Sequence, residues 1–126
     1  MTRARAFAST VCVVTGVYYS AFGALLFFSP HVFWSRIAPI GPFNEHYARD
    51  VGSFLLPLGI FLLVAASDPI HFRAVVVLAA ATSALHAIGH LVDGIKNTRD
   101  VVSDFALSAV AILLFAILPR RERERT

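Results

Sequence analysis

Three residues whose types and spacing suit chemistry lie near the end of the third apolar stretch of the chain. His86, His90 and Asp93 are spaced i, i+4 and i+7. At about 100° per residue, an α-helix places such residues within about 60° of one another, so they share one face. Two histidines at this spacing can bind one metal ion, and a carboxylate one turn further on could supply a third ligand.

A second polar group lies at the beginning of an earlier apolar stretch. His46 and Asp50 share one helical face there, together with Ser53. Glu45 and Arg49 are also four residues apart, with the acidic residue first. That order is the favourable one for an ion pair on a helix. Both polar groups therefore combine imidazole with carboxylate side chains.

These groups are compatible with several kinds of site. The residues of the first group could hold a metal ion, or histidines from two helices could hold a haem. Because histidine titrates near neutral pH and can pair with a carboxylate, the groups could also relay protons or bind a quinone or a polar headgroup. The alternative without a ligand is a buried hydrogen-bond network that locks helices together.

The composition of the chain indicates that these residues lie in a membrane protein. Of the 126 residues, 57% are hydrophobic and only 15% are charged, and the mean hydropathy is +0.71. A soluble domain is typically about 25% charged, and one of this size could not bury so much apolar surface. The chain is therefore expected to lie in a lipid bilayer.

Four stretches are expected to cross that bilayer as helices: residues 7–28, 46–66, 72–95 and 101–118. A spanning helix needs about 20 predominantly apolar residues. The first stretch is too long for the core of a signal peptide, so we expect it to be a span. The predicted fold is all-α: one domain, 1–126, that forms an integral membrane bundle of four antiparallel transmembrane helices.

Turn and capping residues separate these stretches. Pro30 begins a run of helix breakers that predicts a loop over 29–43, lying at the membrane interface. Asn44 is expected to cap the second span. Ser67-Asp68-Pro69 predicts a tight turn before the third span, and Gly94 predicts its end.

The basic residues predict the orientation. Seven would lie on the side of the two chain ends, and four on the other side: Arg36, Arg49, Lys96 and Arg99. This bias favours cytoplasmic N- and C-termini in the inner membrane. The basic residues cluster at the chain ends, beside the membrane spans. The net charge of +3 is therefore better explained by contact with anionic lipid than by binding of nucleic acid.

Connectivity brings the polar groups to one membrane level. The second span begins on the side opposite the termini, the third ends there, and the fourth begins there. We therefore expect one cluster, open to the non-cytoplasmic side, that contains Glu45, His46, Arg49, Asp50, His86, His90, Asp93 and Asp104. Ionisable residues in membrane helices are functional candidates because their burial in lipid is costly.

Small residues predict where the helices pack closely. Gly16, Ser20 and Ala24 form one stripe with four-residue spacing, and Ala79, Ser83 and Ala87 form another. Such stripes allow helix backbones to approach each other, within one chain or between copies. Tyr18, Tyr19 and Tyr47 are expected to pack in the core or at the interface rather than to line a pocket.

Two segments resemble the small DoxX-like membrane proteins of bacteria. They are Phe43 to Gly52, read Phe-Asn-Glu-His-Tyr-Ala-Arg-Asp-Val-Gly, and His86-Ala-Ile-Gly-His90-Leu-Val-Asp93, set among four short spans. The resemblance implies a helical bundle with a polar pocket near one face and a quinone-linked redox partner. It assigns no catalytic residues. The single cysteine, Cys12, leaves no pair for dithiol redox chemistry.

These observations favour a non-catalytic function. We expect an accessory or small-ligand-binding protein of the inner membrane, built around the predicted cluster. The alternatives are a quinone-linked redox or metal-dependent enzyme component and, third, a proton-coupled carrier. A metal ion or a quinone is the candidate cofactor, and a membrane protein or a second copy of the chain is the candidate partner.

Overall fold

All regular secondary structure in the described part of the chain is α-helical. The computed structural model describes residues 3–39 and 41–94, together with 102, 106, 108–110, 112–114 and 116. Helices with defined bounds are α1 (Arg3–Phe28), α2 (Pro30–Arg36), α3 (Glu45–Ala65) and α4 (Arg73–Asp93). No strand occurs within these residues. The prediction of an all-helical fold is confirmed to this extent.

Three of the helices, α1, α3 and α4, are long and apolar enough to cross a membrane. They lie within a few residues of the first three predicted spans, and the chain is a multi-pass membrane protein. Most of the fourth predicted span, 101–118, lies outside the described residues. Those of its residues that are described are helical, and one of them, Leu114, is fully buried.

Large apolar side chains face outward along the three long helices. Val14 is 64% exposed, Phe54 75%, and Leu85 69%. In water, so much exposed apolar surface would drive aggregation. In a bilayer the acyl chains cover it, so the exposure pattern agrees with a membrane location.

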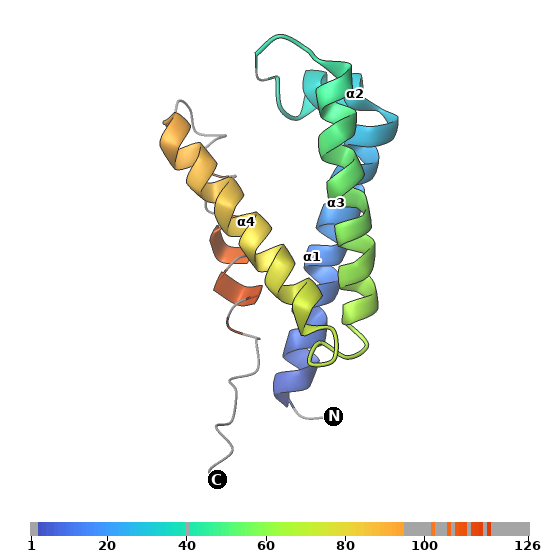
Figure 1. Cartoon of the computed structure of the whole chain (residues 1–126), viewed down its shortest axis with the longest axis vertical. Coiled ribbons are helices and arrows are strands. Elements are labelled where there is room, and N and C mark those ends of the chain that lie inside the picture. Colours follow the sequence, from blue (N-terminus) through green and yellow to red (C-terminus); the bar gives the residue numbers. More distant parts are fainter. Residues whose placement is uncertain are drawn as a thin grey trace.

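Helices α1 and α3 form a tight antiparallel pair, which runs vertically in Figure 1. Glycines set seven residues apart on each helix make the contact: Gly16 and Gly23 on α1, Gly52 and Gly59 on α3. A Cβ atom added at Gly52 would lie 2.7 Å from the backbone nitrogen of Phe27, and one added at Gly16 would lie 2.9 Å from Leu63. Only glycine allows the two backbones to come so close.

The small-residue stripe predicted on the first span takes part in this contact through Gly16 and Ser20. The predicted stripe on the third span is also used within the chain, because Ala79, Ser83 and Ala87 of α4 are buried. The partner glycines on α3, Gly52 and Gly59, were not predicted from the sequence.

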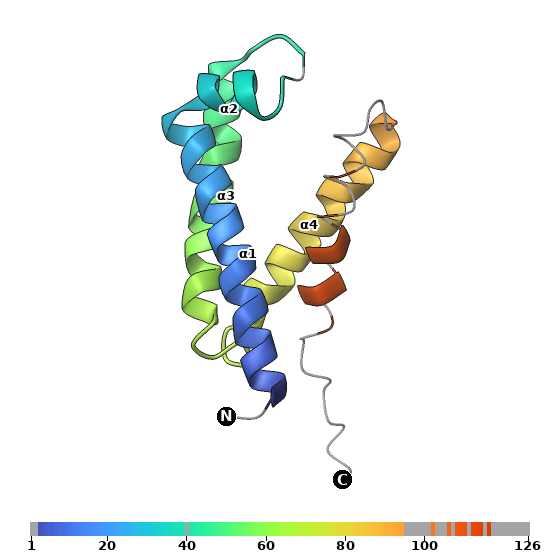
Figure 2. The ribbon, with the colours of Figure 1, turned by 180° about the vertical axis from the view of Figure 1, so that it is seen from behind.

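The first half of helix α4 packs against the α1–α3 pair, and its second half diverges from that pair. Val76, Ala79 and Ala80 of α4 are buried in one apolar cluster with residues of α1 and α3, among them Cys12 and Leu62. Beyond this cluster α4 leads away from α1 and α3, as both views show (Figures 1 and 2). The end of α4 at Asp93 is therefore separated from the beginning of α3.

Local sequence explains how the helices begin. The side-chain oxygen of Asn44 accepts a hydrogen bond of 3.0 Å from the backbone N–H of Tyr47, so the predicted cap of α3 is confirmed. The prediction of a loop throughout 29–43 is wrong at its start, where α2 forms. Pro30 is the first residue of α2, a position that suits proline because its φ is already helical and the missing N–H would have no partner there.

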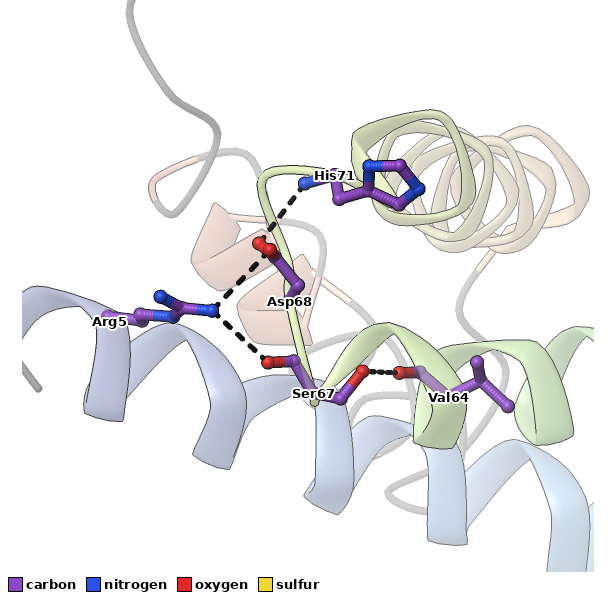
Figure 3. Close-up of polar contacts among 5 residues, drawn as sticks. All are labelled: Arg5, Val64, Ser67, Asp68 and His71. Atoms are coloured by element: carbon purple, nitrogen blue, oxygen red, sulfur yellow. Dashed lines mark hydrogen bonds and ion pairs between the residues drawn. The ribbon is translucent and has the colours of Figure 1, made fainter.

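The predicted turn at Ser67-Asp68-Pro69 connects α3 to α4 and also contacts α1 (Figure 3). Asp68 accepts a bond of 3.2 Å from the backbone N–H of His71, and its other carboxylate oxygen lies 3.4 Å from the guanidinium of Arg5. Arg5 also donates to the carbonyl of Ser67 at 3.4 Å. The beginning of α1 is thereby attached to the turn that starts α4.

Candidate functional site

The polar residues at the beginning of α3 form two pairs on the helix surface. The carboxylate of Glu45 lies 2.6 Å from the guanidinium of Arg49, which confirms the predicted ion pair. The Nε2 atom of His46 lies 3.5 Å from a carboxylate oxygen of Asp50. All four side chains are half-exposed or more, and His46 is 89% exposed. Exposed pairs of this kind contribute little to stability, so they leave a charged surface available to other molecules.

The two histidines of α4 point toward one another. The Nε2 atoms of His86 and His90 are 3.0 Å apart, and the ring centroids are 4.9 Å apart. A neutral imidazole carries one N–H donor and one acceptor nitrogen, so one ring can donate to the other. The sequence prediction that these two rings share one face of the helix is confirmed.

Asp93 does not join them as a third metal ligand. The described residues contain no group of three or more histidine, cysteine, aspartate or glutamate side chains that could hold one metal ion. The reason is the helix rise of about 1.5 Å per residue, which sets Asp93 about 10.5 Å from His86 along the axis although both share a face. Asp93 is the last residue of α4, and Gly94, with a φ of 80°, follows it.

The eight residues predicted as one cluster divide into two groups within the described part of the chain. Both groups lie at the end of the molecule opposite to the 66–72 turn, as connectivity predicted (Figure 1). Because α4 diverges from α3, the pairs on α3 and the histidines on α4 are held apart laterally. The eighth residue, Asp104, lies outside the described residues.

For a bilayer centred on the middle of α4, the histidine pair would lie at the depth of the hydrocarbon layer. Ser83 is the midpoint of α4 (Arg73–Asp93). With a rise of about 1.5 Å per residue, His86 and His90 lie about 4.5 and 10.5 Å beyond it along the axis, inside the roughly 15 Å half-thickness of a bilayer core. The charged pairs of α3, in contrast, occupy its first two turns.

A buried hydrogen bond one turn below the histidines links α4 to α1. The hydroxyls of Tyr19 and Ser83 are bonded to each other, and the Ser83 hydroxyl donates to the carbonyl of Ala79 at 3.0 Å. From the sequence both residues were expected only to pack, and the bond between them was not predicted. The signal was present, since Cys12, Gly16, Tyr19 and Gly23 follow the helical repeat of a buried face.

The site therefore offers a pair of imidazoles at membrane depth and a charged surface at the same end of the molecule. Such a pair can share a proton, donate to an acceptor atom of a ligand, or coordinate a metal ion. No family model, no curated protein and no solved structure matches this chain.

Proposed function

We propose that this chain is a non-catalytic accessory protein of the inner membrane that binds a small ligand through His86 and His90. The observation that carries the proposal is the 3.0 Å separation of the two Nε2 atoms at hydrocarbon depth. Polar side chains at that depth are costly and are kept where they bind something or pair with one another. Two adjacent imidazoles provide both a donor and an acceptor to a ligand that arrives from the membrane or from its surface.

The charged pairs at the beginning of α3 suit the approach of such a ligand. Glu45, His46, Arg49 and Asp50 lie at the same end of the molecule as the histidine pair, and all four are exposed. They present both signs of charge at the level of the lipid headgroups. This arrangement favours a polar or ionisable ligand over a wholly apolar one.

The proposal includes an architecture of four antiparallel spans and kinship with DoxX-like proteins. A fourth span is supported by the helical residues described between 102 and 116 and by the burial of Leu114 in the core cluster. The kinship is supported by the two segments 43–52 and 86–93, which contain the exposed pairs of α3 and the histidine pair of α4.

The proposal also places both termini in the cytoplasm, which single cysteines can test. The native chain serves as the blank because its one cysteine, Cys12, is fully buried. Ser35→Cys in α2 and Ser67→Cys in the α3–α4 turn place a thiol at opposite ends of the spans, at exposed positions. With a membrane-impermeant maleimide, we expect Ser35→Cys to react in intact cells and Ser67→Cys only after the membrane is opened. The reverse pattern would invert the orientation.

Ligand binding is tested by comparing what copurifies with two forms of the protein. We expect the native chain, purified in detergent, to retain one small molecule or ion per chain that the His86→Ala/His90→Ala double variant loses. Elemental analysis, an absorption spectrum and mass spectrometry of an organic extract would detect it. His71→Ala is the matched control, because His71 is an exposed histidine at the other end of α4. If all three proteins retained the same amount of copurified ligand, and the double variant were only less stable, the histidine pair would merely stabilise the bundle.

A further inference from the structure

We infer that the ligand of the histidine pair is a divalent transition-metal ion that takes two nitrogen ligands at a right angle, of which Cu²⁺ and Ni²⁺ are the examples. The inference rests on the proposed function, since it names the ligand of the same site. Three observations support it: the separation of the two ring nitrogens, the position of the pair at the end of a helix, and the carboxylate in the next turn.

The geometry of the pair fits two neighbouring positions around such an ion. With metal–nitrogen bonds of about 2.05 Å, the 3.0 Å between the two Nε2 atoms subtends an angle of about 94° at the metal. That angle is close to the right angle of a square-planar or tetragonal site and smaller than the tetrahedral angle that zinc prefers. Nitrogen ligands in square-planar or tetragonal geometry are typical of Cu²⁺ and Ni²⁺.

The end of α4 also attracts positive charge. His90 lies in the last turn of α4, where unpaired backbone carbonyls give the helix terminus a partial negative charge. Asp93, one turn beyond His90, adds a carboxylate at the same end. Asp93 is too far along the axis to share an ion with His86, but its charge lowers the cost of placing a dication at the pair.

On the described surface His86 is exposed and His90 is half-buried. Among the described residues, no third histidine, cysteine, aspartate or glutamate side chain joins the two rings to hold one ion, so they supply two ligands there.

Copper titration of the purified chain tests this inference. The full-length protein, without a polyhistidine tag, is titrated with Cu²⁺ in detergent micelles, with glycine as a competing chelator that suppresses weak sites. We expect one Cu²⁺ per chain and an electron paramagnetic resonance spectrum with two nitrogens in the equatorial plane. We expect His90→Ala to weaken binding about 100-fold, as is typical when two linked contacts become one.

A relocated histidine provides the matched control. In the Ile88→His/His90→Ala variant the number of histidines is unchanged, but the second ring stands two residues from His86 and therefore on the other side of the helix. Ile88 is 53% exposed, so the position accepts a polar ring. We expect this variant to bind as weakly as His90→Ala, whereas His46→Ala on α3 should bind like the native chain.

Two results would overturn the inference. Copper binding that is equal in the native and relocated proteins would show that other groups hold the ion. No copper bound above the competitor would show that the pair binds no metal. If in that case an organic molecule still copurified with the native chain and not with the double variant, the proposed ligand-binding function would stand and only the metal would be wrong.

Discussion

Replacing Gly59 with alanine is expected to destabilise the protein by about 1–3 kcal/mol, the range typical of overpacked contacts. The added methyl group would overlap the backbone nitrogen of Ser20 and would lie 2.8 Å from the carbonyl oxygen of Gly16. These are backbone atoms of α1, so a side-chain rotation cannot relieve the contact and the two helices must separate. Unfolding in mixed detergent micelles, followed by circular dichroism, measures the change.

The same substitution on α4 is the control. A Cβ atom at Gly89 would lie within 4 Å of no other described part of the chain beyond its own neighbours and helix backbone, and Gly89 lies inside a helix. Glycine to alanine in a helix interior ordinarily stabilises by about 0.5–1 kcal/mol. We therefore expect Gly89→Ala to be neutral or stabilising. Equal effects of Gly59→Ala and Gly89→Ala would contradict the close approach of α1 and α3.

Leu62→Ala is expected to destabilise the protein by about 2–5 kcal/mol. The side chain of Leu62 on α3 is fully buried, in a cluster that also contains Val11 of α1 and Val76 of α4. Lipid cannot fill the space that the leucine leaves, because α1, α3 and α4 enclose it. The substitution therefore weakens the contacts that hold α4 against α1 and α3.

Leu85→Ala on α4 tests whether burial is the cause. Leu85 is 69% exposed, and the bilayer surrounds it in the folded protein. The truncation leaves no enclosed cavity, so we expect a change within about 0.5 kcal/mol. A large loss at Leu85 together with a small loss at Leu62 would mean that the exposed face of α4 is a protein contact and that the cluster is not the core.

The sequence predicted the helices and their ends well because these depend on local physics. The length of an apolar run determines a span, and the capping side chain of Asn44 acts within four residues of itself. Pro30 shows that the rule for proline depends on position. Proline breaks a helix when it lies in the interior, but it is favourable as the first residue, where Pro30 lies in α2.

The arrangement of the site could be predicted only along the membrane normal. Connectivity places the beginning of α3 and the end of α4 at the same end of the molecule, and Figure 1 agrees. Their lateral separation depends on how α4 packs against α1 and α3, which the spacing of residues within one helix does not specify. The contact between Gly23 on α1 and residues of α3 was missed for the same reason, since it is a relation between two helices.

The glycine contacts of α1 and α3 have a consequence for the order of assembly during synthesis. Every one of them lies between residues 16 and 63. Two adjacent spans that fit each other so closely can associate in the bilayer as soon as the second has been inserted, while the ribosome is still adding later residues. The α1–α3 pair would thus already be packed when α4, which bears His86 and His90, is inserted. Helix α4 would then pack against this preformed pair.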